Sequence, residues 1–372
     1  MKCKLSDICS FRKGKVEVEN LNVKNYISTE NMLPNKCGIT EASSLPTVSL
    51  TQEYKNGDVL VSNIRPYFKK IWQAQYDGGC SNDVLVFVPK TNTDKDFLYY
   101  VLADDDFFTY SMATSKGTKM PRGDKTSIMQ YEVPLIDLQV QEKIASVLKA
   151  LDKKIELNNE INNNLEQQAQ AIYQQMFIDN ARSDWAEGTL SDIADITMGQ
   201  SPNGSSYNED GTGTIFFQGR AEFGFRFPSV RLYTTEPKRM ARLNDTLMSV
   251  RAPVGDLNVA HMDCCIGRGL AAIHSKSHHQ SFVLYTVFSL KKQLDVFNGE
   301  GTVFGSINRN SLNDMPILIP SDDILDEFER IVAPMDLTIR NNYDENCRLQ
   351  DIRDTLLPRL MSGELDVSDI DL

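Results

Sequence analysis

The sequence predicts an α+β protein in which two similar α+β domains are joined by two long helices, which form an antiparallel intramolecular coiled coil with pseudo-twofold symmetry. Three observations lead to this prediction: a long heptad repeat, a tandem duplication of the chain, and short β-like runs separated by turn residues. In chain order we expect a first domain at 1–138, a central long helix at 139–185, a second domain at 186–320, and a C-terminal long helix with its tail at 321–372.

Length and composition restrict the classes of protein to which this chain can belong. A chain of 372 residues can form two domains with cores of their own. Its start is charged and no apolar run approaches the roughly 20 residues of a membrane span, so we expect a cytoplasmic protein. Seven cysteines without a C-x-x-C pair argue against a disulfide framework or a zinc ribbon. The net charge of −12 comes mostly from 321–372, which leaves both domain segments nearly neutral and able to carry a basic face.

Both domain segments contain short β-like runs broken by Gly, Pro, Asn and Asp. DVLVSNI at 58–64 and DTLMSVR at 245–251 are two such runs, at matching places in the two segments. One or two helices accompany them, with Asp96–Met112 expected in the first domain and His279–Phe297 in the second. This mixture of elements predicts one α+β domain in each of the two segments.

The central helix is predicted from Gln139–Phe177, which contains helix formers and neither Gly nor Pro. Seam residues recur at alternating steps of four and three for more than four heptads, which is the pattern of a coiled coil. Two asparagines interrupt the apolar seam, and buried asparagine at a seam fixes register and partner. The predicted seam consists of Ile144, Leu148, Leu151, Ile155, Asn158, Asn162, Leu165, Ala169, Ile172 and Met176.

The chain repeats itself at an offset of 184 to 187 residues. The run LSDI occurs at Leu5 and again at Leu190, with a Gly six residues after each Ile. The segment 150–167 aligns with 334–351, and this alignment pairs the two seam asparagines with Asn342 and Asn346. We therefore expect a tandem duplication of the form domain, helix, domain, helix.

The C-terminal helix has a less regular seam than the central one. Its predicted members are Phe328, Ile331, Met335, Ile339, Asn342, Asn346, Leu349, Leu356 and Leu360. Pro334 is expected to kink or restart this helix. Chain connectivity favours an antiparallel pair in which Asn158 and Asn162 face Asn342 and Asn346, with a pseudo-dyad near Glu160 and Asp344. A helix of the central length is about 58 Å long and would act as a spacer.

A search for catalytic motifs finds none. The sequence lacks a G-x-x-x-x-G-K-[ST] loop, an H-E-x-x-H helix, a G-x-S-x-G elbow and the N-P-P-[YF] run of adenine methyltransferases. Its four histidines have no acidic or cysteine neighbour at ligand spacing, which favours surface or core histidines over a metal site. We predict no catalytic residue, no metal ligand and no cofactor in this chain.

Both domains do contain basic and amide side chains in Gly-rich loops, and these side chains hold phosphates or read base edges. Taken singly, each is more often a solvated surface charge. In the second domain Arg outnumbers Lys by 8 to 4, and Arg offers the bidentate fork that fits a phosphate or a guanine edge. The candidate DNA-binding residues are Arg65, Lys69, Lys70, Lys116, Lys119, Arg122, Lys125, Ser201, Asn203, Gln218, Arg220, Arg226, Arg231, Arg239, Arg251 and Arg309.

Four motifs give the chain a family resemblance: LSDI with its following Gly, MGQSPNGSSYN at 198–208, VPLIDLQVQEKIASVLKALDKKI at 133–155, and TLLPRLMSGELDV at 355–367. Together they resemble the DNA-specificity subunit of Type I restriction-modification systems. The resemblance implies a non-catalytic subunit with two target-recognition domains that read a bipartite site on double-stranded DNA. It implies docking of two methyltransferase subunits and of restriction/translocase subunits. S-adenosylmethionine, ATP and Mg²⁺ would be bound in those partners.

Two other classes of protein are compatible with the sequence. A two-headed scaffold could use the coiled coil to separate protein-binding domains, and gel shifts with duplex DNA would distinguish it. A lone nuclease or methyltransferase would need an unrecognised site, and the scattered E-x-K matches such as Glu53–Lys55 occur at chance level.

Overall fold

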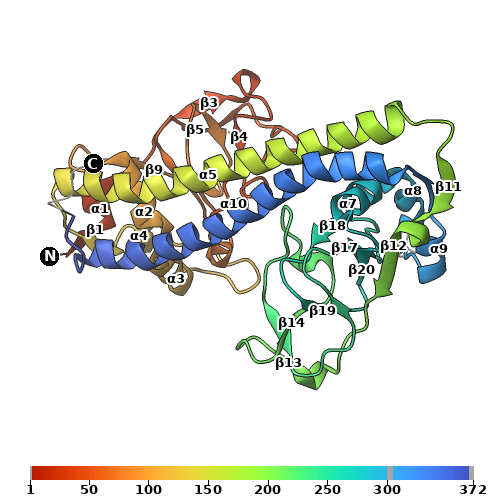
Figure 1. Cartoon of the computed structure of the whole chain (residues 1–372). Helices are drawn as coiled ribbons and strands as arrows, with labels where there is room; N and C mark the ends of the chain where they lie inside the picture. The colour runs from red at the N-terminus through yellow and green to blue at the C-terminus, as the bar shows by residue number, and fades with distance from the viewer. Residues whose placement is uncertain (1, 300–304, 368–372) are drawn as a thin grey trace. The chain divides into compact units, whose positions relative to one another are not determined.

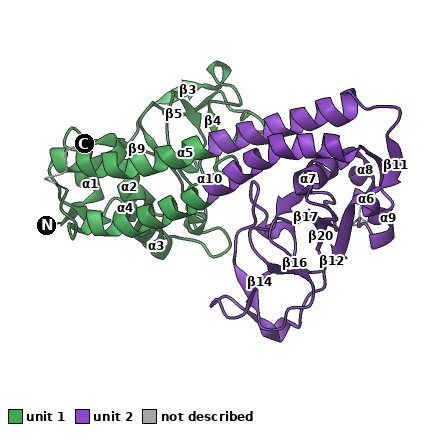
Figure 2. Ribbon diagram, viewed as in Figure 1, with its two compact units in different colours: residues 1–158, 344–372 green, residues 159–343 purple. Residues whose placement is uncertain are grey.

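The computed structural model describes residues 2–299 and 305–367 and forms two compact units (Figures 1 and 2). Unit 1 consists of residues 1–158 and 344–372, and unit 2 of residues 159–343. Two long helices each contribute one part to each unit: α5 spans Leu138–Tyr173 and α10 spans Asp322–Ser362. Both units combine sheets with helices, which confirms the predicted α+β class.

Unit 1 contains two four-stranded sheets and one two-stranded sheet. The first has the order β2 (Cys9–Phe11), β9 (Val84–Pro89), β6 (Val59–Ser62), β7 (Ile71–Gln73). The second has the order β3 (Lys15–Glu17), β5 (Leu50–Tyr54), β8 (Gly78–Cys80), β4 (Tyr26–Ile27), and only β4 and β8 pair in parallel. The third joins β1 (Lys2–Lys4) to β10 (Glu132–Pro134).

The helices of unit 1 other than α5 and α10 are short. They are α1 (Leu5–Ile8), α2 (Lys95–Ala103), α3 (Asp105–Ala113) and α4 (Lys125–Ile128), with 3₁₀ turns η1 (Val18–Asn20) and η2 (Pro66–Phe68). The single helix expected over Asp96–Met112 is therefore wrong, because it breaks at Asp104. That residue has extended backbone angles, and its carboxylate accepts the backbone N–H of Asp106, which caps α3.

The main core of unit 1 lies between the β2-β9-β6-β7 sheet, α2, α3 and the two long helices. Within this unit α5 and α10 are antiparallel, since Asp152 contacts Arg353 whereas the later Asn158 contacts the earlier Asn346. The Nδ2 of Asn158 donates to Asn346 Oδ1 at 2.9 Å and to Glu345 Oε2 at 2.7 Å. The seam here thus has one buried polar layer.

Unit 2 repeats the first sheet of unit 1 and modifies the second. Its first sheet has the order β12 (Ala194–Met198), β20 (Leu270–Ser275), β17 (Thr246–Ser249), β18 (Leu257–Val259). The second has the order β13 (Tyr207–Asn208), β15 (Leu232–Thr234), β14 (Thr214–Phe217), β19 (Cys264–Ile266), β16 (Met240–Ala241), with β14 and β19 parallel. A third pairs β11 (Ala186–Thr189) with β21 (Pro316–Ile319).

The helices of unit 2 include a two-part replacement for the predicted His279–Phe297 helix. They are α6 (Leu190–Ile193), α7 (Gln280–Ser289), α8 (Lys291–Asp295) and α9 (Arg309–Asn313), with 3₁₀ turns η4 (Gly204–Ser206), η5 (Arg220–Glu222) and η6 (Val296–Asn298), and a π-helical turn η3 (Gln174–Asp179) that ends α5. The α7 helix ends before Leu290 and α8 begins after it, so the predicted single helix is wrong, although helices do occupy the predicted segment.

The helix pair continues in unit 2 with an aromatic core. Asn342 Nδ2 donates to Asn162 Oδ1 at 2.8 Å, so this pair of asparagines faces each other as Asn158 and Asn346 do in unit 1. Further along, the ring of Tyr173 lies 5.9 Å from that of Phe328. Because Tyr173 follows Asn162 whereas Phe328 precedes Asn342, the two helices are antiparallel in this unit as well. Rings from α7 complete this core.

One expectation about the C-terminal helix is wrong and another holds only in part. The helix continues through Pro334, so it does not restart there, and a kink at this proline stays a prediction. Ile331 is 36% exposed, whereas Val332 is fully buried, so the seam steps from Phe328 to Val332 by four residues rather than three. The remaining predicted seam residues are buried or partly buried: Leu148, Leu151, Ile155, Asn158, Asn162, Leu165, Ile172, Met335, Ile339, Asn342, Asn346, Leu349 and Leu356.

The LSDI repeat has one local structure in both units. Leu5 and Leu190 are fully buried at the start of α1 and α6. The carboxylate of Asp7 accepts the N–H of Lys4 at 2.8 Å, and that of Asp192 accepts the N–H of Thr189 at 2.7 Å. Each motif therefore anchors and caps one short helix.

Candidate nucleic-acid interface

In unit 2, the parallel pair of strands positions two loops side by side. Phe216 of β14 pairs with Cys265 of β19, and Phe217 pairs with Ile266. Because parallel strands end at the same edge of a sheet, the residues that follow them leave the sheet together. These segments are 218–220 after β14 and 267–269 after β19.

A third loop follows β12 and contains Gly199 and Ser201, and glycines let it pack against the other two loops. A Cβ atom on Gly199 would lie 2.1 Å from the carbonyl oxygen of Gly267, and one on Gly267 would lie 2.8 Å from that of Gln218. Only glycine permits this backbone-to-backbone packing. The Arg268 N–H donates to Ser201 Oγ at 3.2 Å, which ties the 267–269 loop to this third loop.

A cavity of about 230 Å³ opens between these loops. It is lined by Ser201, Gln218, Gly219, Arg220, Arg251, Ala252, Arg268 and Gly269. We call the polar members of this set, Ser201, Gln218, Arg220, Arg251 and Arg268, the arginine cradle. Four of the five are predicted from the sequence, and all three arginines are exposed. Three guanidinium groups beside an amide and a hydroxyl can bind phosphate oxygens or a base edge.

Arg268 is the member that the sequence reasoning missed. It stands between Gly267 and Gly269, and a lone Arg flanked by two glycines marks a side chain on a tight turn. The same reasoning that selected Arg220 would have selected it. Its backbone bond to Ser201, by contrast, depends on contacts between loops far apart in the sequence.

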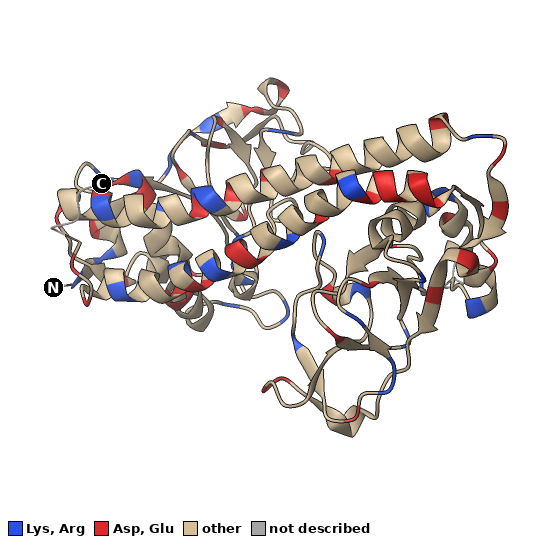
Figure 3. Ribbon diagram, viewed as in Figure 1, with Lys and Arg blue, Asp and Glu red and all other residues tan. Residues whose placement is uncertain are grey.

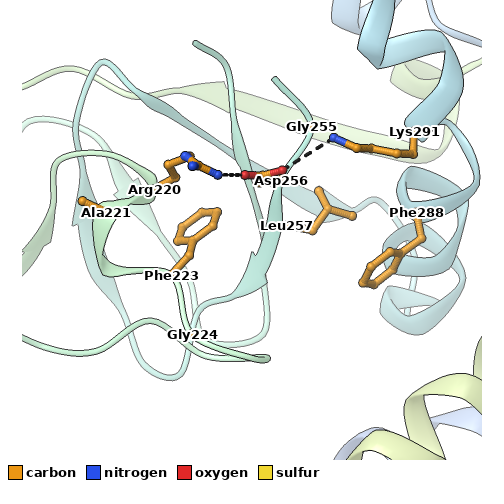
Figure 4. Close-up of a pocket in the computed structure, with 9 residues that line it drawn as sticks. All are labelled: Arg220, Ala221, Phe223, Gly224, Gly255, Asp256, Leu257, Phe288 and Lys291. Atoms are coloured by element: carbon orange, nitrogen blue, oxygen red, sulfur yellow. Dashed lines mark hydrogen bonds and ion pairs between the residues drawn. The ribbon is translucent and has the colours of Figure 1, made fainter. Parts of the chain in front are cut away.

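A second cavity, of about 620 Å³, shares Arg220 with the cradle. Figure 4 shows Arg220 reaching Asp256, which also faces Lys291 at 3.5 Å, while Phe223, Leu257 and Phe288 supply apolar side chains. The Asp256 carboxylate orients the Arg220 guanidinium in the absence of another anion. A phosphate or base edge would have to compete with that carboxylate.

The other candidates in unit 2 are placed elsewhere on its surface. Asn203, Arg239 and Arg309 are exposed. Arg231 is exposed as well, and its guanidinium binds Glu222 at 3.1 Å and Glu209 at 3.2 Å. The contact with Glu222 is the first cause of a raised pKa at Arg231. Arg231, Arg239 and Arg309 thus carry positive charge outside the cradle, and Asn203 adds a neutral amide.

Arg226 is the clear error among the candidates. Its side chain is 5% exposed and binds Glu166 of α5 at 3.1 Å and Asp336 of α10 at 3.5 Å. It also donates to the hydroxyl of Tyr285 at 3.0 Å. Sequence reasoning placed it on the DNA-binding surface because Arg is usually exposed, but here two helix carboxylates bury it inside unit 2.

In unit 1, the two basic loops that the sequence singles out lie against each other. Ile64 and Arg122 form an antiparallel bridge, and the Arg65 N–H donates to the carbonyl of Pro121 at 2.8 Å. Lys116 and Arg122 exchange two backbone hydrogen bonds and close a small loop, with Lys119 exposed between them. The loop arrangement therefore gathers Arg65, Lys116, Lys119 and Arg122 in one place.

Surface carboxylates accompany three of the candidate cations of unit 1. Lys116 binds Asp124 at 2.6 Å and lowers its pKa to about 2. Arg122 binds Asp83 at 3.2 Å, and Lys69 binds Asp105 at 2.7 Å. Exposed ion pairs of this kind are worth little and exchange readily for another anion.

Lys70 and Lys125 differ from the other lysines. The Lys70 Nζ donates to the carbonyl of Thr29 at 2.6 Å, which holds this group against the domain, and burial lowers the pKa of this lysine. Lys125 begins α4, is exposed, and lies over the ring of Phe11 at 5.9 Å. Of the two, Lys125 is the one placed to meet a ligand.

The start of α10 differs in charge from the loops of the two units. Figure 3 shows Lys and Arg on the loops of both units as well as on the long helices, and Asp and Glu on the first turns of α10. That start of α10 contains Asp322, Asp323, Asp326, Glu327 and Glu329. A polyanion would be attracted to the loops and repelled by this end of α10. None of the helices within 2–299 and 305–367 is both long and apolar enough to cross a membrane.

Comparison with solved structures identifies the class of fold. The chain is similar to the crystal structure of the Type-I restriction-modification system S subunit from M. genitalium, with a TM-score of 0.60 and 16% identity over 97% of this chain and 96% of that one. At this identity the likeness concerns the fold. Two α+β domains with two long helices are therefore a known architecture.

Comparison of sequences confirms the resemblance to Type I specificity subunits. Residues 1–167 match the family described as Type I restriction modification DNA specificity domain. A Methanocaldococcus jannaschii protein that bears the name type I restriction enzyme MjaX specificity subunit is 28% identical, over 98% of this chain and 93% of its own length. The type I restriction enzyme HindI specificity subunit of Haemophilus influenzae is 24% identical over 91% of this chain and 94% of its own. The chain is thus similar, over nearly its whole length, to specificity subunits of type I restriction enzymes.

Proposed function

We propose that the chain reads a bipartite site on double-stranded DNA, with one α+β domain for each half-site, and that its helix pair holds methyltransferase and restriction subunits. The chain itself would carry out no chemistry. Methyl transfer with S-adenosylmethionine and ATP-driven cleavage with Mg²⁺ would belong to the partners.

The arginine cradle carries this proposal. Its three guanidinium groups come from three different loops. The close glycine packing of Gly199 and Gly267 holds the loops of Arg220 and Arg268 against the loop of Ser201. A rigid constellation of Arg, Gln and Ser suits recognition of a base edge better than a mobile charged loop does. The basic loops of unit 1 would serve the other half-site with Lys119 and Arg122.

The proposal differs from a protein scaffold in what the cradle binds. Replacing Arg220 by Ala removes one guanidinium from both cavities of unit 2. We expect cognate-duplex affinity to fall about 10- to 100-fold, as for the loss of one bidentate base contact. A phosphate contact would instead lower affinity for all duplexes and reduce the salt dependence of binding.

The measurement is fluorescence anisotropy with the full chain bound to its methyltransferase subunits, over a range of salt concentrations. Arg182→Ala is a matched control, since Arg182 is exposed, ion-paired with Asp184 and outside the cradle. Equal affinities for Arg220→Ala and Arg182→Ala would remove the cradle from the DNA interface. Absence of any duplex binding by the wild-type complex would favour the scaffold.

A further inference from the structure

Two histidines and an aspartate converge in unit 2, away from the cradle. His278 and His279 precede α7, and Asp326 lies in the second turn of α10. The Nε2 atoms of both histidines lie 2.9 Å from the same atom, Asp326 Oδ1. The sequence expectation that the histidines lack an acidic neighbour is therefore wrong for His278 and His279, whose carboxylate comes from a distant helix, and also for His274, which faces Asp245.

One ring of the trio is held in place. The His279 side chain is 4% exposed, and its Nδ1 lies 2.9 Å from Ser277 Oγ. A ligating imidazole usually makes such a bond through its other nitrogen, which fixes both tautomer and orientation. His278 and Asp326 are open to solvent, with side chains 79% and 60% exposed, so an ion could reach the site.

The three ligand atoms also suit one ion. All lie within 4.8 Å of one another. Zinc bonds to imidazole nitrogen and carboxylate oxygen are about 2.0–2.2 Å long, which separates neighbouring tetrahedral ligands by about 3.3 Å. The 2.9 Å separations would open by a few tenths of an ångström, and the exposed side chains of His278 and Asp326 can move that far.

We propose that His278, His279 and Asp326 bind one divalent transition-metal ion of the Zn²⁺ type, with water in the remaining position. Each imidazole would bind through Nε2 as the neutral tautomer with its proton on Nδ1, and for His279 that proton would be donated to Ser277 Oγ. No net loss of protons is required. Within unit 2 the ion would tie the segment before α7 to the first turns of α10.

His274 provides the internal contrast. Its Nδ1 faces Asp245 at 2.6 Å, but Arg242 lies 3.3 Å from its Nε2. One histidine with one carboxylate and a neighbouring cation makes a poor metal site, since the guanidinium repels a divalent ion. The His274 pair therefore serves as the control for histidine loss in the same unit.

The test uses the full purified chain, stripped with EDTA and titrated with Zn²⁺ and separately with Co²⁺. We expect one equivalent of ion, a rise in the unfolding midpoint, and cobalt d–d absorption bands of N/O ligation without thiolate charge-transfer bands. His278→Ala and Asp326→Asn should each weaken binding more than tenfold. Ser277→Ala keeps all three ligands and should weaken it about tenfold. His274→Ala should bind like the wild type.

Two results would overturn the site. One is the absence of saturable binding and of any midpoint shift in the wild type, which leaves a hydrogen-bonded trio only. The other is unchanged affinity in His278→Ala, which would place the ion elsewhere, such as on the seven cysteines. Because the His278 side chain is exposed, this variant is expected to fold and its result is decisive.

Discussion

The two units attach their domains to the long helices with the same device. In unit 1 the hydroxyl of Tyr100, on α2, donates to Asp152 of α5 at 2.7 Å. In unit 2 the hydroxyl of Tyr285, on α7, donates to Asp336 of α10 at 2.9 Å. These tyrosines and aspartates occupy equivalent positions in the tandem repeat. A Tyr–Asp contact between a domain helix and a long helix is thus duplicated with the chain.

The cation beside each aspartate comes from a different place. In unit 1, Arg353 of α10 binds Asp152 at 2.8 Å, so the ion pair joins one long helix to the other. In unit 2, Arg226 comes from the domain and binds carboxylates on both helices. Arg226 is 5% exposed and Arg353 is 23% exposed. The Tyr–Asp contact is thus the same in both units. Unit 2 differs because its arginine is buried between the domain and the two helices.

Loss of the two arginines should therefore have unequal effects. Arg226→Ala leaves Glu166 and Asp336 buried without their cation, and we expect the free energy of unfolding of unit 2 to fall by about 3–5 kcal/mol. Arg353→Ala leaves a partly solvated Asp152 that keeps its tyrosine, so unit 1 should lose about 1 kcal/mol.

The chain offers a reporter for each unit. Trp72 lies in unit 1 and Trp185 in unit 2, so urea unfolding followed by fluorescence in Trp185→Phe and Trp72→Phe backgrounds separates the two. Equal losses for Arg226→Ala and Arg353→Ala would mean that burial does not distinguish the two junctions.

The asparagine layers of the seam provide a smaller contrast. Asn158→Ala removes two side-chain bonds from a buried position, one to the Glu345 carboxylate and one to Asn346 Oδ1, so we expect a loss of about 2 kcal/mol in unit 1. Asn162→Ala removes the bond from Asn342, which is only partly buried, and a long bond of 3.4 Å to the carbonyl of Ile339. Neither bond involves a carboxylate, so unit 2 should lose about 1 kcal/mol. The same fluorescence measurement applies. The exposed Asn163→Ala is the control, and a similar loss there would show only reduced helix stability.

The pH dependence of the unfolding free energy of unit 2 should report the protonation of its buried carboxylates. Burial raises the pKa of Asp336 and of Glu166 above their ordinary values, and Arg226 only partly opposes this. A raised pKa in the folded state means that the proton stabilises folding at low pH and that this contribution is lost as pH rises through the folded pKa.

Asp336→Asn isolates that effect, since the amide does not titrate. The unfolding free energy of the wild type minus that of Asp336→Asn should fall as pH increases from about 4 to 7. Urea unfolding of unit 2 at several pH values measures it. A difference that grows with pH would mean that the ion pair with Arg226 outweighs burial.

Repetition and periodicity made much of this molecule predictable. Steps of four and three placed Asn158 and Asn162 on one seam, and the repeat supplied their facing partners. The helix does not restart at Pro334, because a single missing donor does not outweigh the packing of a long helix.

Side-chain burial that depends on tertiary contacts was not predictable. Arg226 is a loop arginine in sequence and a core cation in the structure, because Glu166 and Asp336 meet it from two helices. His279 likewise gains Asp326 only through folding. Arg268 was within reach of sequence reasoning, and its turn between two glycines was the signal.

The central claim is that each unit reads its own half of a bipartite DNA site. Selection of preferred duplexes from a random library, by the chain in complex with its methyltransferase subunits, tests it most directly. With Arg220→Ala the account predicts relaxed base preference in one half-site, and with Lys119→Ala a change confined to the other half-site, each measured against the wild-type selection. Changes in both half-sites from either variant, or in the same half-site from both, would contradict it.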